Sequence, residues 1–154
     1  MKNSNQQRLI LIERVLLLKE VSIFSETPES ILGEIAHLME EQTVDPNINI
    51  VTEGEIGNCM YIIFQGQVRV HKGNQTLAIL KEKNYFGELS LLDTETRSAT
   101  VTSQSECILY KINQEPFFDL IDFRPEVLKA VMQNLSKRLR DANYKIFELS
   151  KKTT

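Results

Sequence analysis

The spacing of apolar residues changes along the chain. Over residues 6–24, and again over 27–41, apolar side chains recur every three or four positions, which predicts two amphipathic helices. Over residues 43–112 the period falls to two, and Ile, Val, Tyr and Thr become frequent, as in short strands. Helical spacing returns after Asn113. The pattern therefore predicts helices, then a series of strands, then helices.

Local signals mark where the helices begin. Thr27 is expected to be an N-cap, followed by Pro28 at the first helical position. The packing face of this helix is predicted at Ile31, Leu32, Ile35, Leu38 and Met39. In the preceding helix the repeating positions are Leu9, Ile12, Leu16, Lys19 (through its aliphatic stem) and Ile23.

The alternating region divides at Gly- and Asn-containing turns. The predicted strands are 48–52, 60–65, 67–72, 76–80, 98–102 and 107–112. Gly66 lies between two of them and is expected to form a hairpin turn with a positive φ. Asn47 is expected to tolerate the left-handed conformation in the turn that begins at Asp45. So many short antiparallel strands predict a mostly β, α+β fold, an antiparallel jelly-roll β-barrel with flanking helices.

The C-terminal region contains a long helix. Asn113 is a predicted N-cap for a short helix that ends near Phe123, and Pro125 begins a helix that runs to about Ser150. Its apolar residues alternate in steps of four and three over about three heptads: Leu128, Met132, Leu135, Leu139, Ala142, Ile146 and Leu149. This seam favours a parallel homodimer through residues 128–149. The alternative is one amphipathic helix packed on its own domain.

Composition narrows the possible functions. With 154 residues the chain fits a single domain, and its formal net charge of −3 provides no global field to attract nucleic acid. Basic residues on the last helix are better explained as a solvated coiled-coil flank than as a DNA-binding surface. The two cysteines, Cys59 and Cys107, have no metal-ligand spacing, and only two histidines are present, so no metal site is expected. No run is apolar enough to insert into a membrane, and a cytoplasmic location is expected.

Residues 85–101 carry the candidate chemistry. Gly87 opens a very short helix whose N–H groups attract an anion, and Arg97 offers a planar fork of donors suited to phosphate oxygens. Ser98 and Ala99 add a hydroxyl and an unobstructed backbone N–H. A carboxylate at Glu88 would repel a phosphate unless it accepts a hydrogen bond from a sugar hydroxyl. The alternative is a structural salt bridge between Glu88 and Arg97.

The ordered sequence of this segment is similar to a known motif. Phe-Gly-Glu-Leu-Ser-Leu-Leu at 86–92, followed by Arg-Ser-Ala-Thr-Val at 97–101, resembles the phosphate-binding cassette of cyclic-nucleotide-binding domains. That family includes catabolite-activator-like regulators, kinase regulatory subunits and gated channels. Residues 53–63 and 66–70 resemble the hairpin before the cassette, and the resemblance covers roughly residues 16–150.

The resemblance implies roles for individual residues. Glu88 would bind the ribose 2′-OH and Arg97 the exocyclic phosphate oxygens. Further contacts around them are implied for Gly87, Leu89, Ser90, Ser98 and Ala99. Val70 and Leu77 match strand positions that line the base, although both also suit a plain core. Arg138 matches a helix position that reaches toward the ligand, and Asn143 one that reads the base edge, in some relatives from the dimer partner.

The function expected from this resemblance is a non-enzymatic regulatory sensor. It would bind a cyclic nucleotide as ligand, without a cofactor, and cAMP is favoured over cGMP because the Arg-Ser-Ala form resembles the bacterial activators. Residues 1–20 would be an N-terminal helical extension and 21–150 the domain, with a barrel at about 43–112 and C-terminal helices at about 114–150. Binding would be relayed through those helices to an effector absent from this chain. The alternatives are a degenerate fold that serves as a dimerisation or docking module without ligand, and a cupin-type metal enzyme, which the scarcity of histidines opposes.

Overall fold

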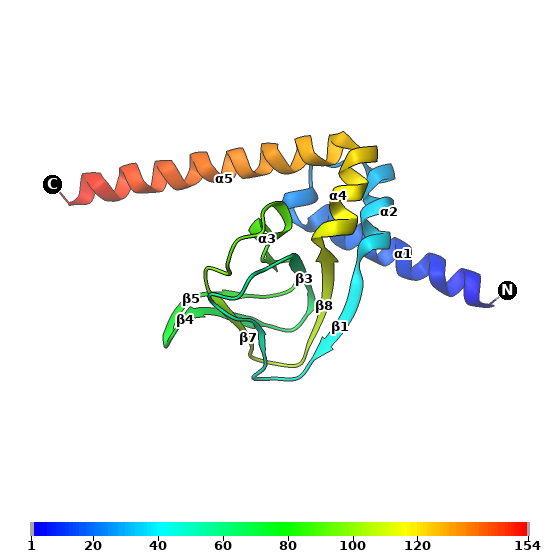
Figure 1. Ribbon diagram of the computed structural model, residues 1–154, viewed down its shortest axis with the longest axis horizontal. Helices are drawn as coiled ribbons and strands as arrows, with labels where there is room; N and C mark the ends of the chain where they lie inside the picture. Colours follow the sequence, from blue (N-terminus) through cyan, green and yellow to red (C-terminus); the bar gives the residue numbers. More distant parts are fainter. Residues whose placement is uncertain (1, 154) are drawn as a thin grey trace.

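Two layers of antiparallel strands form the centre of the protein in the computed structural model, which describes residues 2–153 (Figure 1). In chain order the elements are α1 (Lys2–Glu20), a 3₁₀ turn η1 (Ser22–Phe24), α2 (Glu29–Leu38), β1 (Glu40–Val44), β2 (Asn49–Val51), β3 (Cys59–Gln65), β4 (Val68–Lys72), β5 (Gln75–Leu80), β6 (Tyr85–Phe86), α3 (Leu89–Leu92), β7 (Thr100–Ser103), β8 (Cys107–Asn113), α4 (Gln114–Phe123) and α5 (Pro125–Lys152). One sheet has the order β1-β8-β3-β6 and the other β2-β7-β4-β5. The predicted fold class, mostly antiparallel β with flanking helices, is confirmed. The strand pairings form two sheets and do not close a single barrel.

The alternation of β3 explains how the layers are held together. Cys59 to Ile63 are all buried, because both faces of this central strand are covered. Met60 and Ile62 join an apolar cluster beneath the helices, whereas Tyr61 and Ile63 join a second cluster with residues from both sheets. One strand therefore serves two cores, and its side chains are apolar on both faces.

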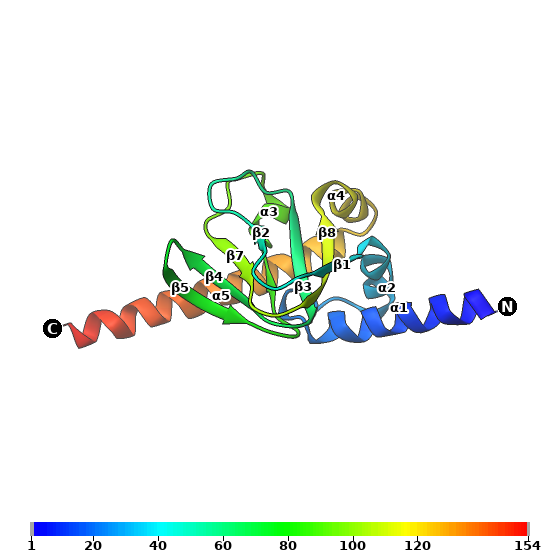
Figure 2. The ribbon, with the colours of Figure 1, turned by 90° about the horizontal axis from the view of Figure 1, so that it is seen from below.

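The helices cover the outer face of the β1-β8-β3-β6 sheet. Side chains of α1, α2, α4 and the first turns of α5 pack there; Leu18, Ile35, Phe117 and Val127 are fully buried. Figure 2 shows α1, α2 and α4 at one end of the molecule, away from the β4–β5 hairpin, which α5 passes. The segment from β6 to α3 also packs against the apolar cluster beneath the helices, through Tyr85 and Leu91, so the helices border the candidate site.

Several local predictions were wrong. Thr27 does not cap α2: the N-cap position is Pro28, and the buried Thr27 hydroxyl has no hydrogen-bond partner. Gly66 has the expected positive φ of 99°, but β3 and β4 lie in different sheets, so the turn is a crossing between sheets and not a hairpin. β1 is absent from the predicted strands because its sequence is polar; its place in the sheet depends on backbone pairing with β8, which no side-chain pattern reports.

The packing face of α1 also differs from the prediction. Leu9, Ile12 and Leu16 are 68%, 55% and 56% exposed, and the helix instead packs through Leu17 and Leu18. Because the apolar residues of α1 are distributed around the whole circumference of the helix, their spacing does not identify the buried face.

The long helix α5 contacts the domain through its N-terminal half, from Val127 to Arg138. Val127, Ala130 and Val131 are buried, while the α5 axis continues past the sheets and away from the other helices (Figure 1). Most of the predicted heptad seam faces solvent: Met132, Leu139, Ile146 and Leu149 are at least 57% exposed. Leu135 of the seam does pack against the core of the domain, so the alternative of a helix packed on its own domain applies to the first part of the seam and not to its exposed remainder. Among residues 2–153, no helix is both long and apolar enough to cross a membrane.

Candidate functional site

The candidate site forms where β6 leads into α3 and where the chain returns at Arg97. Gly87 joins β6 to α3 with a φ of 78°, a left-handed conformation that glycine adopts without steric cost. A Cβ atom at Gly87 would lie 2.5 Å from Arg97 Nη1, and one at Gly57 would overlap Arg97 Nε and Ser90 Oγ. Both glycines therefore make room for the guanidinium.

Arg97 is a buried cation without an ion pair. Arg97 is only 8% exposed. Its guanidinium donates two hydrogen bonds, from Nη1 to the Gly87 carbonyl (3.4 Å) and from Nη2 to Cys59 Sγ (3.2 Å). Both acceptors are neutral. In the part of the chain that the structure describes, no carboxylate lies within salt-bridge distance of this guanidinium. An uncompensated buried charge costs several kcal/mol, so the site is suited to an incoming anion.

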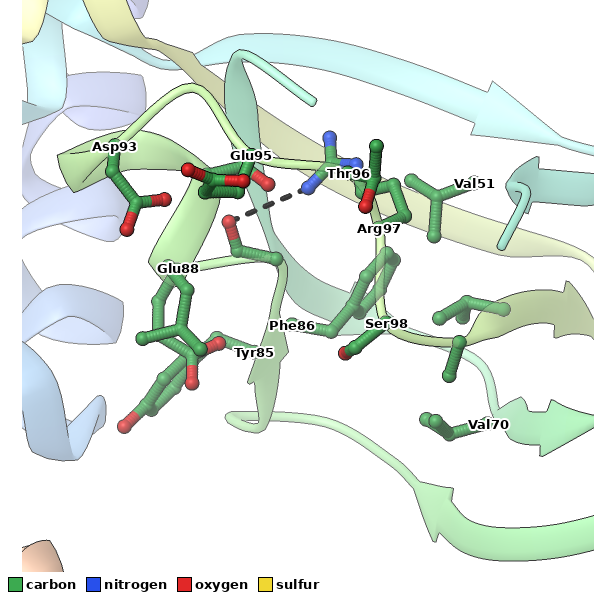
Figure 3. Close-up of a pocket in the computed structure, with 15 residues that line it drawn as sticks. Val51, Val70, Tyr85, Phe86, Glu88, Asp93, Glu95, Thr96, Arg97 and Ser98 are labelled. Carbon is green, nitrogen blue, oxygen red and sulfur yellow. Dashed lines mark hydrogen bonds between the residues drawn. The ribbon is translucent and has the colours of Figure 1, made fainter. Parts of the chain in front are cut away.

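Backbone donors lie beside this cation. Within residues 2–153, no acceptor is found for the backbone N–H groups of Glu88, Ser98 and Ala99. All three residues line a cavity of about 390 Å³, together with Arg97 (Figure 3). In Figure 3 a dashed line joins Arg97 to Gly87, and Glu88 and Tyr85 lie at one end of the cavity and Val70 at another. A cation and free N–H groups around a cavity of this size form an anion-binding site for a small organic ligand.

Glu88 pairs with the long helix and not with Arg97. Its carboxylate Oε1 accepts a hydrogen bond from Arg138 Nη1 at 2.9 Å, and the Glu88 side chain is only 13% exposed. Burial lowers the pKa of Arg138, but the hydrogen bond and charge of Glu88 outweigh it, so the net shift is upward. The sequence also allowed a structural salt bridge between Glu88 and Arg97, and the structure does not contain it. Glu88 thus keeps a carboxylate at the cavity while Arg97 stays unpaired.

A small polar network connects this pair to the rest of α5. Arg138 Nη1 also donates to the Tyr85 hydroxyl at 3.4 Å, and the Ser22 hydroxyl donates to the same oxygen at 3.2 Å. One helical turn before Arg138, Asn134 Nδ2 donates to the Ser22 carbonyl at 2.9 Å. The cassette, the η1 turn and α5 are therefore joined at one point.

Most of the residues singled out from the sequence meet at the cavity. Its lining contains Gly87, Glu88, Leu89, Ser90, Arg97, Ser98, Ala99 and Val70. Arg138 is outside the lining but contacts Glu88, which is consistent with a helix position that reaches toward the site.

Leu77 and Asn143 are not brought to the cavity. The register of β4 and β5 shifts between Val70, which pairs with Ala78, and His71, which pairs with Thr76, so Leu77 has no partner on β4; it is 49% exposed and does not line the cavity. Asn143 is exposed on the projecting part of α5. The register between β4 and β5, which decides which face Leu77 takes, is not visible in the pattern of β5 alone.

Further lining residues were not among the predicted contacts: Val51, Tyr85, Phe86, Asp93, Glu95, Thr96 and Val101. Six of them lie within residues 85–101, so the cassette itself was the signal that could have identified them. Val51 could be found only from its pairing with Val101 in the sheet.

Comparisons with known proteins agree with this geometry. A family model described as "Cyclic nucleotide-binding domain" matches residues 41–122, which is more than half of the chain. A cAMP-dependent protein kinase regulatory subunit from Yarrowia lipolytica is 33% identical over 106 residues, covering 68% of this chain and 28% of that protein. A cGMP-dependent protein kinase from Eimeria tenella is 32% identical over 127 residues, covering 76% of this chain and 12% of that protein. The chain thus spans less than a third of the length of these two relatives.

The fold agrees as well. The crystal structure of the N-terminal domain of a transcriptional regulator from Streptomyces coelicolor A3(2) superposes with a TM-score of 0.77 at 27% identity, covering 84% of this chain and 94% of that one. The family model covers the sheets and the cassette with its unpaired Arg97, and the solved neighbour shares the arrangement of sheets and helices. The chain belongs to the cyclic nucleotide-binding domain family and resembles a regulatory module, not a catalytic one.

Proposed function

We propose that this protein is a sensor that binds a cyclic nucleotide in the cavity at the cassette, with cAMP favoured over cGMP. The single observation that carries the proposal is Arg97, a cation that is 8% exposed and has only neutral acceptors. A cyclic phosphate carries one negative charge and two free oxygens, which match the guanidinium fork. The neighbouring N–H groups of Ser98 and Ala99 would complete the binding of these oxygens.

Glu88 is proposed to bind the ribose 2′-OH. A carboxylate has room for more than one donor, so Arg138 can hold one oxygen while the hydroxyl donates to the other. The remaining cassette residues, Gly87, Leu89 and Ser90, would surround the sugar and phosphate, and Val70 would contact the base. Because α5 leads Asn143 away from the cavity of its own chain, a role for Asn143 at the base requires a second chain.

Binding is proposed to be relayed through α4 and α5 to an effector. The support is the shared carboxylate: a ligand that binds Glu88 changes the partner of Arg138, and with it the contact that joins α5 to the cassette. The ligand can shift the position of α5 only by its differential affinity for the two positions. The effector would be a domain or protein that contacts α5.

A homodimer through residues 128–149 is part of the proposal. The exposed apolar stripe on α5, with Met132, Leu139 and Ile146 among its members, is what a parallel coiled coil would bury. We place the nucleotide-binding domain at residues 21–150 and the helical extension at 1–20, and we expect the protein to act in the cytoplasm.

Calorimetric titration with cAMP and cGMP tests the proposal. We expect both to bind, cAMP more tightly, and Glu88→Gln to bind more weakly and to discriminate less between ribose and 2′-deoxyribose ligands. An unchanged sugar preference in Glu88→Gln would remove the role of this residue. If the wild type binds neither nucleotide, the alternative holds, a fold that serves as a dimerisation or docking module without ligand.

A further inference from the structure

One of the two hydrogen bonds of the Arg97 guanidinium is made to the thiol of Cys59. Nη2 donates to Cys59 Sγ at 3.2 Å, and Nη1 donates to the backbone carbonyl of Gly87 at 3.4 Å. These are the only hydrogen bonds that orient the guanidinium within residues 2–153. A thiol sulfur is a weak acceptor and carries no charge, so it can orient a cation without neutralising it.

Cys59 is itself held rigidly. It is 5% exposed, begins β3 and pairs with Asn113 of β8. Its cluster includes Tyr61 and Phe86, whose rings stack with centroids 5.2 Å apart. A side chain fixed by a central strand is a suitable anchor for a group that must point into a cavity.

The two groups that accept hydrogen bonds from the guanidinium, the Gly87 carbonyl and the Cys59 thiol, are neutral. Burial raises the pKa of the Tyr61 hydroxyl above its ordinary value, with a further upward contribution from the neighbouring Cys59, so Tyr61 also stays uncharged. The positive charge of Arg97 is therefore left for an anion on the cavity side.

We infer that Cys59 is the positioning residue of Arg97: its thiol fixes the guanidinium for the ligand phosphate and, because it is neutral, leaves the charge available. This inference rests on the proposed function and adds to it the residue that orients Arg97 and thereby affects the affinity for the phosphate. An acidic side chain at the same place would pair with Arg97 and compete with the phosphate.

Variants of Cys59 separate the two parts of this role. Cys59→Ser keeps a neutral acceptor, and we expect cAMP affinity within about threefold of wild type. Cys59→Ala removes one of the two anchors and should weaken binding by about fivefold, the worth of one long hydrogen bond to a neutral acceptor. Cys59→Asp should weaken binding by more than about 100-fold, because an internal charged pair replaces the phosphate. Cys107 is a second buried free thiol and lies outside the cavity, so Cys107→Ala is the matched control and should bind cAMP as the wild type does.

A measurement on the ligand-free protein tests the positioning directly. In ¹⁵N-labelled protein, the Nε–Hε resonance of Arg97, assigned by its loss in Arg97→Met, should be resolved in the wild type and in Cys59→Ser. It should broaden or move to the position of a freely rotating arginine in Cys59→Ala. Loss of packing alone would not distinguish Ser from Ala in this way.

The outcomes separate this inference from the proposed function. Wild-type affinity and an unchanged Arg97 resonance in Cys59→Ala would overturn the inference, even with normal cAMP binding by the wild type. Tight binding by a folded Cys59→Asp protein would overturn it as well. A wild type that binds no cyclic nucleotide refutes the proposed function, and the Arg97 resonances still decide whether Cys59 positions the guanidinium.

Discussion

Replacing Arg97 with methionine should weaken ligand binding while stabilising the ligand-free fold. Methionine fills most of the volume of the arginine stem without its charge. The guanidinium now makes two hydrogen bonds, at 3.4 Å and 3.2 Å, both long and both to neutral acceptors, and we assign them about 1 kcal/mol each. Burying an unpaired cation costs several kcal/mol. We therefore expect the free energy of unfolding of Arg97→Met without ligand to rise by about 1–3 kcal/mol.

The effect on binding has the opposite sign. Two hydrogen bonds from a guanidinium to phosphate oxygens contribute about 1.5–3 kcal/mol each, so their loss should weaken cAMP binding by about 10²- to 10⁴-fold. Urea unfolding followed by circular dichroism measures the stability, and calorimetric titration measures the affinity. At a ligand concentration of about 100 times its Kd, the wild type should gain about 2.7 kcal/mol and the variant almost nothing.

Arg124→Met is the matched control for this prediction. Arg124 forms an exposed pair with Glu34 at 3.0 Å and lies outside the cavity, so its loss should change the stability little and leave binding unchanged. If Arg97→Met is instead destabilised by more than its control, the guanidinium holds the fold together, and the reasoning from an uncompensated charge is refuted.

Further predictions follow from the same geometry. Gly57→Ala places a methyl group against Arg97 Nε and Ser90 Oγ, so titration should show strongly weakened cAMP binding in a folded protein; wild-type affinity would mean that the guanidinium can move aside without loss. Leu139→Asp combined with Ile146→Asp, at positions 63% and 65% exposed, should yield a monomer in sedimentation without lowering the domain's stability, whereas a wild type that is already monomeric contradicts the coiled coil. Because burial raises the pKa of Tyr61 above 10, the unfolded chain releases this proton first, and stability should fall as the pH rises past about 10. Tyr61→Phe should reduce that fall in urea midpoints measured from about pH 8 to about pH 11, and an equally steep fall would contradict the assignment.

Much of the fold could be predicted because its signals are local. The change of period from helix to strand, the left-handed Asn47 with a φ of 64° and the helix that begins at Pro125 all depend on neighbours in sequence, and the structure contains each of them. The errors arose where distant groups decide. β1 is polar but is held by backbone pairing to β8, and α1 is apolar on every side, so only its contacts select the buried face.

The candidate site divides in the same way. By itself the sequence determined the cassette, since Gly87, Glu88, Arg97, Ser98 and Ala99 occur in one segment and the backbone brings them to one cavity. Only the tertiary structure decided the charge partners. Glu88 meets Arg138 from 50 residues away and Arg97 meets Cys59 from 38 residues away, so the salt bridge within the cassette does not form. Hydrogen bonds and ion pairs depend on distance in space, and the packing of β3 and α5 against the cassette sets those distances, whereas the sequence pattern records only which groups are available.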